Sequence, residues 1–231
     1  MSVRSRSPRA PSDAVRHPVF SRVYAKVSTA TEGDVGPYRA ELLAGLSGRV
    51  IEIGAGNGLN FAHYPPEVSE VVAIEPERLL RGLALTAARR SRTPVDVVPG
   101  IAEALPVKSE AFDAAVLCLV LCSVRDTGRA LREVHRVLRP DGVLRFFEHG
   151  VAPGRGMAAV QRGLDRTVWP FLFGGCHVAR DPVASLTDRG FTVEAERAVT
   201  IPAKGPRLPT SYLVLGSARR PREAPGPGAG G

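Results

Sequence analysis

Five short apolar runs alternate with amphipathic stretches between residues 49 and 149, and this alternation constrains the fold more than any other feature. Strands separated by helices pair in parallel, with right-handed crossover connections. The pattern therefore predicts a doubly wound parallel sheet with helices on both faces. The expected strands span residues 49–54, 70–76, 93–100, 111–120 and 142–149. The expected helices span residues 37–48, 77–90, 126–142 and 180–190.

The last part of the chain breaks this alternation. Two further strands are expected at 191–199 and 210–218, and the proline-rich loop between them leaves no room for a helix. Consecutive strands joined in this way pair antiparallel. The predicted fold is therefore α/β and Rossmann-like, with a seven-stranded sheet in which five parallel strands precede an antiparallel terminal pair.

Charge divides the chain into a body and two tails. Residues 1–30 hold six basic side chains against one acidic, and residues 219–231 hold three against one, so the tails carry most of the net charge of +8. We therefore expect no dedicated nucleic-acid surface on the body. The expected organisation is a basic, partly disordered tail over 1–30, one domain over 31–218 and a disordered Pro/Gly tail over 219–231. Peripheral contact of the N-terminal tail with an anionic membrane is compatible with its charge.

Three features predict a cytoplasmic protein. The longest apolar run, residues 114–121, is too short to cross a bilayer. The N-terminal segment has no apolar core of the kind that a secretory signal contains. The three cysteines have no metal-like spacing, so we expect reduced thiols and no metal site.

The segment VIEIGAGNG places Gly54, Gly56 and Gly58 directly after the first expected strand. A triphosphate-binding loop needs a lysine and a hydroxyl residue after its last glycine, and a Leu-Asn pair follows here. The dinucleotide fingerprint G-x-G-x-x-G is one residue longer. Glu52, just before the loop, would repel a pyrophosphate and attract a cation. The loop therefore predicts a nucleoside ligand with a positive end, which S-adenosylmethionine provides.

Glu75 ends the second expected strand, where doubly wound folds place the ribose of a nucleoside. A carboxylate there can accept hydrogen bonds from both ribose hydroxyls. This feature suits NAD and S-adenosylmethionine equally, so an NAD-dependent oxidoreductase is the runner-up. Alternatively, Glu75 binds no ligand and only caps the helix that follows.

Several segments resemble, in the expected order, the motifs of class I S-adenosylmethionine-dependent methyltransferases with a type 11 domain. They are VIEIGAGNG, VVAIEP, AFDAAVLCLVLCSV and LREVHRVLRPDGVLRFFEH. More narrowly, LVLCSV, FFEH, LFGGC and Arg180 are similar to methyltransferase-like alkyl-thiol S-methyltransferases and their bacterial relatives. The resemblance implies the strand order 3-2-1-4-5-7-6 and methyl transfer to a small-molecule acceptor, with a thiol preferred. Open alternatives are O- or N-methylation of a quinone precursor, a lipid headgroup or another metabolite, and a non-catalytic module.

The glycine loop, Glu75 and the resemblance together predict a cofactor site. The expected contacts are Glu52, Gly54, Ala55, Gly56, Gly58, Asn60, Glu75, Pro76, Ala102, Glu103, Leu119 and Leu121. In many relatives an aspartate holds the adenine amino group, and Ile101 stands in its place here. We therefore expect the adenine to rest on the backbone near Ala102, with Glu103 as a weaker candidate.

His149, at the end of the fifth expected strand, lies next to the expected methyl group. A neutral imidazole there either takes a proton from a thiol or phenol, with ordinary pKa values of about 8.5 and 10, or only hydrogen-bonds a loop. Asp165 is a second candidate base. Alternatively, it is an exposed charged residue on a surface helix. Cys118 and Cys122 are expected to be apolar pocket and core residues, because no further ligands lie near them in the sequence. Cys176 is expected at the mouth of the pocket.

An aromatic segment precedes the terminal strand pair. It carries Trp169, Phe171 and Phe173. Such a stripe belongs either to the core or to a substrate pocket. Its position favours a small and fairly apolar acceptor.

Overall fold

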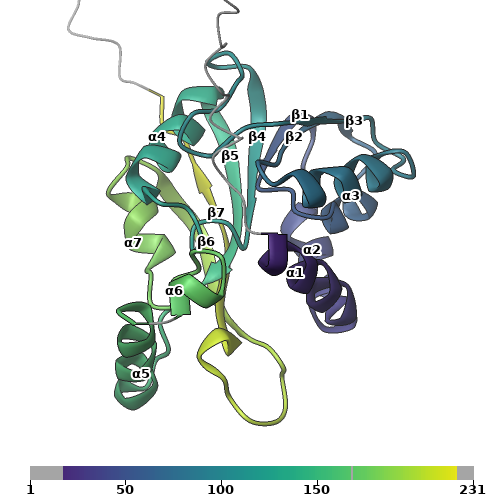
Figure 1. Ribbon diagram of the computed structural model, residues 1–231. Helices are drawn as coiled ribbons and strands as arrows, with labels where there is room; N and C mark the ends of the chain where they lie inside the picture. The colour runs from purple at the N-terminus through teal and green to yellow at the C-terminus, as the bar shows by residue number, and fades with distance from the viewer. Residues whose placement is uncertain (1–17, 168, 223–231) are drawn as a thin grey trace, which may run out of the picture.

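A computed structural model describes residues 18–167 and 169–222 (Figure 1). Its seven strands form one sheet in the order β3-β2-β1-β4-β5-β7-β6, as expected. The first five strands run parallel, and β7 pairs antiparallel with both β5 and β6. The strands are β1 (Gly48–Ile53), β2 (Val68–Ile74), β3 (Val95–Val98), β4 (Phe112–Cys118), β5 (Leu138–His149), β6 (Thr192–Thr200) and β7 (Tyr212–Arg219).

Helices cover both faces of this sheet (Figure 1). One buried core contains Leu131 of α4 and Leu186 of α7, and a second contains Leu42 of α2 and Ala84 of α3. The two cores lie on opposite faces because successive side chains of a buried strand point to opposite sides. The α-helices are α1 (Pro18–Ala30), α2 (Glu32–Leu43), α3 (Arg78–Ala88), α4 (Thr127–Val137), α5 (Arg155–Asp165), α6 (Trp169–Leu172) and α7 (Pro182–Thr187). The short 3-10 helices are η2 (Leu59–His63) and η3 (Pro209–Ser211).

Strand register brings four loops to one edge of the sheet. Ile53 of β1 pairs with Leu117 of β4, and Cys118 pairs with Phe147 of β5. The segments that follow β1, β2, β4 and β5 therefore leave the sheet side by side. In open α/β sheets, ligands bind at this carboxyl edge.

Several boundaries differ from the expected ones, among them the start of the C-terminal tail, since Arg219 ends β7 and Arg220 is buried. Residues 18–30, which we assigned to the N-terminal tail, form helix α1; the rest of that tail, and residues 223–231, lie outside the described residues. Helix α2 begins at Glu32, five residues before Pro37, because Glu32 and Asp34 favour a helix start and Val35 already packs into the core. Strand β5 begins at Leu138, since that residue pairs with β4 before the ladder resumes at Val143.

None of the helices in residues 18–167 and 169–222 is long and apolar enough to cross a membrane.

Candidate cofactor and acceptor site

The glycine loop after β1 is a sharp turn. Gly54, Gly56 and Gly58 have φ angles of 70°, 57° and 80°, a left-handed region that side chains disfavour. The amides of Gly54 and Ala55 donate to the Ile74 carbonyl at 2.8 and 3.0 Å. The loop is thereby fixed to the end of β2, and an added Cβ on Gly58 would lie 2.8 Å from Ala87 and Phe61.

We expect Gly54→Ala to destabilise the protein by about 2 kcal/mol or more, since a left-handed alanine alone costs about 1–2 kcal/mol. The new Cβ would also lie 2.7 Å from Val120 Cγ2. Gly82→Ala is the matched control, because nothing lies within 4 Å of its added Cβ inside α3. That change should stabilise by about 0.5–1 kcal/mol. Urea unfolding measures both, and equal effects would contradict this account of the loop.

Glu75 lies directly behind this loop with only 4% of its surface exposed. Its carboxylate accepts hydrogen bonds from the amides of Gly56 and Glu77, both at 2.8 Å. Burial raises the pKa of Glu75 to about 7, and these two hydrogen bonds limit the rise. Glu77, and not Glu75, caps helix α3, by accepting from the Leu80 amide at 2.9 Å. Each oxygen of Glu75 keeps a lone pair for a ligand hydroxyl.

Glu52 is equally buried but makes different contacts. Its carboxylate accepts from Asn60 Nδ2 at 2.9 Å and from the Tyr64 hydroxyl at 2.7 Å. Asn60 Oδ1 in turn accepts from Arg39 Nη1 at 2.9 Å. Burial raises the pKa of Glu52 to about 7. Glu52 and Asn60 therefore hold the segment that follows the glycine loop, and their direct contact with a cofactor stays a prediction.

Helix α1 lies over the glycine loop. A Cβ on Gly56 would lie 3.4 Å from the Tyr24 ring, and α1 is next to α3 in the fold (Figure 1). Burial raises the pKa of Tyr24 well above its ordinary value, and Glu75, Cys118 and Cys122 are close enough to raise it further. Tyr24 thus spans the space between the ribose end and the cysteines. Tyr24 was not among the expected site residues because the net charge of residues 1–30 assigned that whole segment to a basic tail.

The segment after β4 is strained and firmly held. Leu119 has a φ of 60°, which is rare for a bulky side chain and is found mainly at functional sites. Both carboxylate oxygens of Glu148 accept from the Val120 amide, at 2.8 and 3.0 Å, and the amides of Leu121 and Cys122 also bond this carboxylate. Burial raises the pKa of Glu148 to about 7. The sequence did not predict that Glu148 holds the backbone after β4. Its only visible feature there is its position at the end of a strand, next to the candidate base His149.

A second group holds the same segment from the opposite side. Arg180 Nη1 donates to the carbonyls of Leu121 and, at 2.8 Å, of Val124. Leu121 is 2% exposed and belongs to the core. The path of the chain over residues 119–124 is therefore fixed by a buried carboxylate on one side and a guanidinium on the other.

The expected adenine contacts, Ala102 and Glu103, lie next to this segment, and Ala102 shares a buried core with Leu121. Ala102 is buried, and Pro76 uses its carbonyl to accept from Arg81 Nη1 at 2.8 Å. The carboxylate of Glu103 accepts from the amides of Arg125 and Asp126 at 2.9 and 3.3 Å. Glu103 therefore stabilises the start of α4, and adenine contacts of these residues stay predictions.

The structure brings Cys122, His149 and Cys176 together. One ligand atom from each lies within 4.8 Å of the other two. Burial lowers the pKa of His149 to about 4, so the imidazole is neutral near pH 7, and its buried Nδ1 has no hydrogen-bond partner. His149 and Cys176 follow Cys122 by 27 and 54 positions in the chain, so the fold, and not the spacing in the sequence, brings the three side chains together.

Asp165 is close to this group but is occupied by the backbone. Its carboxylate oxygens accept from the amides of Val178 and Ala179, at 2.8 and 2.9 Å. It also lies 3.8 Å from His177 Nδ1. These contacts hold the segment that carries Cys176, so the geometry favours a positioning role for Asp165.

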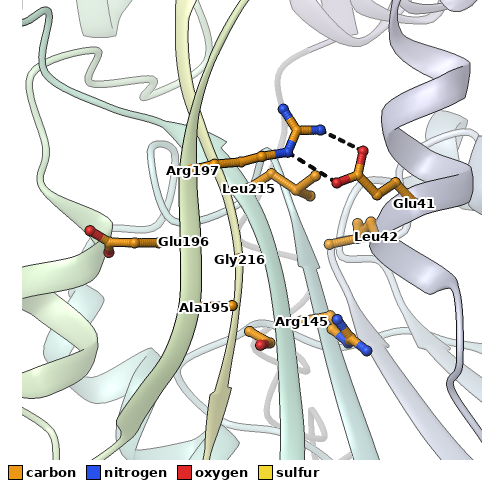
Figure 2. A pocket seen from close by; sticks show the side chains of 9 residues that line it. Glu41, Leu42, Arg145, Ala195, Glu196, Arg197, Leu215 and Gly216 are labelled. Atoms are coloured by element: carbon orange, nitrogen blue, oxygen red, sulfur yellow. Dashed lines mark hydrogen bonds and ion pairs between the residues drawn. The ribbon is translucent and has the colours of Figure 1, made fainter.

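A separate pocket lies between α2 and strands β5, β6 and β7 (Figure 2). Figure 2 shows one ion pair among the lining residues, between Arg197 and Glu41. Arg197 Nε lies 3.0 Å from Glu41 Oε1. The lining residues include none from the glycine loop, the segment after β4 or the cysteine group. This pocket is therefore not part of the candidate site.

The donor set at the sheet edge suits a nucleoside with a positive end. Glu75 offers carboxylate oxygens to hydroxyls, the glycine loop offers backbone groups, and no lysine follows that loop to bind a phosphate. The group of Cys122, His149 and Cys176 lies at the same edge of the sheet.

Comparisons with known proteins agree with this assignment. Residues 51–146 match the family model of the methyltransferase domain. Human thiol S-methyltransferase TMT1B is 32% identical over 183 residues, which cover 76% of this chain and 73% of that protein. Demethylmenaquinone methyltransferase from Renibacterium salmoninarum is 33% identical over 44% of this chain and 42% of that protein. A solved S-adenosylmethionine-dependent methyltransferase from Mesorhizobium loti has the same fold, with a TM-score of 0.59, 21% identity, and coverage of 81% of this chain and 98% of that chain.

Proposed function

The chain belongs to the S-adenosylmethionine-dependent methyltransferases, and we propose that it methylates the sulfur of a small, apolar thiol. The observation that carries the choice of sulfur is the acceptor side of the site. There, two thiols and an unpartnered imidazole nitrogen lie together, with Trp169 beside Cys176. This lining is apolar and polarisable, and it suits a sulfur acceptor better than a charged one. The naming of human TMT1B as a thiol S-methyltransferase supports the same choice.

Membership in this family sets aside the NAD-dependent alternative. The bound cofactor supplies an electrophilic methyl carbon. We propose that Glu75 accepts hydrogen bonds from its ribose hydroxyls and that the backbone from Gly54 to Gly58 carries its methionine part. Leu119, at the strained end of β4, is proposed to face the methyl group.

On the acceptor side, we propose that His149 contacts the acceptor sulfur through Nδ1. Asp165 acts on the site through the backbone that it holds. Direct displacement at a sulfonium needs few catalytic side chains, since alignment and exclusion of water supply most of the acceleration. The chain's own contribution is therefore to orient the two reactants and to receive or release one proton.

A matched panel of acceptors tests the choice of sulfur. Benzyl mercaptan, benzyl alcohol and benzylamine share one skeleton, and formation of S-adenosylhomocysteine is measured with each. Methylation of the thiol at a rate at least about tenfold above the other two is expected, because a soft, polarisable sulfur suits the lining of two thiols and an aromatic ring better than an alcohol or a charged ammonium does. Faster turnover of a phenol or quinol acceptor would instead favour the alternative that the match to demethylmenaquinone methyltransferase suggests.

The pKa of Glu75 predicts how cofactor binding depends on pH. This pKa is raised to about 7 by burial, with Glu77 raising it and Arg81 lowering it. The ionised form accepts both hydroxyls, so affinity should rise with pH through 7, by up to about tenfold per unit below 7. Calorimetric titration with S-adenosylhomocysteine between pH 5.5 and 8.5 measures this.

Glu75→Gln is the control, since Glu52 and Glu148 keep their own pKa values of about 7 in that variant. Its affinity should be lower and nearly independent of pH. An unchanged pH profile in Glu75→Gln would assign the dependence to one of the other two carboxylates.

We propose the cytoplasm as the site of action, because the three cysteines are unpaired thiols. The expected peripheral membrane contact of the basic N-terminal tail also stays a proposal, since residues 1–17 lie outside the described part of the chain.

A further inference from the structure

We propose that Cys122, His149 and Cys176 form a binding site for one thiophilic divalent cation of the Zn²⁺ class. They come from the segment after β4, the end of β5 and the segment after α6, and their ligand atoms lie within 4.8 Å of one another. In the described residues these three side chains form a compact group that a single ion can bridge after small rotamer changes.

The chemistry of the ligands selects the class of ion. Two sulfurs and one imidazole nitrogen suit zinc and other thiophilic metals, whereas calcium and magnesium require oxygen ligands. Three protein ligands leave one position of a tetrahedral ion open. That composition is typical of catalytic zinc sites and not of structural ones, which use four protein ligands.

The surroundings of His149 support the assignment. The backbone at Thr210 and Tyr212 hydrogen-bonds the imidazole, while the buried Nδ1 has no partner. Metal-binding histidines commonly donate their second ring N–H to a backbone carbonyl, which fixes the tautomer and the orientation of the ring. The unpartnered Nδ1 is therefore the nitrogen that we assign to the ion.

Hydrogen bonds join the segments that carry the ligands. The His177 amide donates to the Cys122 carbonyl at 2.7 Å, which sets Cys176 beside Cys122. Gln161 Nε2 donates to the carbonyls of Gly150 and Val178, at 3.2 and 3.1 Å, and so links the neighbourhood of His149 to that of Cys176. The backbone segments that carry the three ligands are therefore held together before any ion arrives, and only the side chains have to adjust.

The local charge is compatible with a bound dication. Two thiolates neutralise it, and the remaining charged groups that act on the ligands are Glu148, Asp165 and Arg180. Glu148 and Asp165 already accept hydrogen bonds from backbone amides, and Arg180 donates to backbone carbonyls. None of the three has to give up its contacts when the ion binds.

The role of the ion rests on the proposed function. The acceptor thiol takes the open position and releases its proton to solvent. Its sulfur electron pair then forms the bond to the methyl carbon, and the electron pair of the broken carbon–sulfonium bond stays on S-adenosylhomocysteine. The ion would thus lower the pKa of the acceptor thiol, and Nδ1 of His149 would hold the ion instead of contacting the acceptor.

Cobalt(II) is the probe for the site itself. The full chain, stripped of metal with a chelator, is titrated with Co²⁺ under anaerobic conditions, and zinc is then used to displace the cobalt. We expect one Co²⁺ per chain, with thiolate charge-transfer and tetrahedral d–d absorption. Cys122→Ser, Cys176→Ser and His149→Ala should each weaken binding by at least about 10- to 100-fold, the loss that removal of an outer-shell partner already causes.

Cys118→Ser is the matched control, because Cys118 is a buried free cysteine that accepts a hydrogen bond from Arg39 Nη1 at 3.2 Å and is not one of the three ligands. Its cobalt spectrum should equal that of the parent chain. Binding of S-adenosylhomocysteine, measured for every variant, shows that each one has folded.

The outcomes separate this proposal from the proposed function. Absence of cobalt absorption in the folded parent chain, or equal loss in Cys118→Ser, overturns the metal site. A mass deficit of two hydrogens that maps to a Cys122–Cys176 disulfide in protein prepared without oxidant also overturns it. Thiol methylation without metal would leave the proposed function intact, and metal binding without thiol methylation would leave only the site.

Discussion

Glu75→Ala is expected to weaken binding of S-adenosylhomocysteine by about 100-fold, because two charge-assisted hydrogen bonds of about 1.5 kcal/mol each are lost and 1.4 kcal/mol is a factor of ten. The same change leaves the Gly56 amide, now 2.8 Å from the carboxylate, without its acceptor. The left-handed loop would then lose one of its fixed points as well. Calorimetric titration at pH 8, where the parent carboxylate is ionised, measures the effect.

Glu77→Ala is the matched control for this prediction. Glu77 is two residues away and caps α3, so its loss should cost about 1 kcal/mol of stability and little affinity. If Glu77→Ala weakened binding as much as Glu75→Ala, the ribose contact would be misplaced.

Glu148→Ala is expected to lower the free energy of unfolding by about 2–5 kcal/mol. Three buried amides, those of Val120, Leu121 and Cys122, lose their acceptor, at about 1–3 kcal/mol each, and relief of the buried carboxylate offsets part of this. Turnover should fall further than stability implies, because the same amides fix Leu119 and Cys122 at the reacting centre. Urea unfolding followed by circular dichroism gives the first quantity, and initial rates under native conditions give the second.

Glu133→Ala controls for the loss of a glutamate. Glu133 also accepts from a backbone amide, that of Leu105 at 2.7 Å, but it is only half-buried on α4 and has Arg136 as a partner. Its loss should cost about 1 kcal/mol and leave turnover per folded molecule unchanged. Comparable losses of turnover in the two variants would show that Glu148 has no special role at the reacting centre.

The order and direction of the strands could be predicted because they follow from hydrophobic periodicity and from chain connectivity. The buried runs of β1 and β4 and the missing helix between β6 and β7 are local features of the sequence. Helix α1 could not be predicted in the same way. Its position depends on packing of Tyr24 against the glycine loop, whereas its composition continues that of the basic tail.

The candidate site likewise contains residues that the sequence predicted and residues that it did not. Gly54, Gly58 and Glu75 lie at the carboxyl edge of the sheet, where their spacing predicted them, and their contact with a cofactor stays a prediction. The group of Cys122, His149 and Cys176 was missed because it assembles only when three carboxyl-edge segments meet. Glu148 and Asp165 act on backbone amides of distant segments, and no spacing in the sequence encodes such partners.

The most direct test of the central claim is a competition experiment with a labelled donor. S-adenosylmethionine carrying a ¹³C methyl group is incubated with the protein and equal amounts of benzyl mercaptan, benzyl alcohol and benzylamine, and mass spectrometry locates the label. The account predicts the label in the methyl thioether, with S-adenosylhomocysteine formed in equal amount. Label in the methyl ether or the methylamine, with none in the thioether, would contradict it.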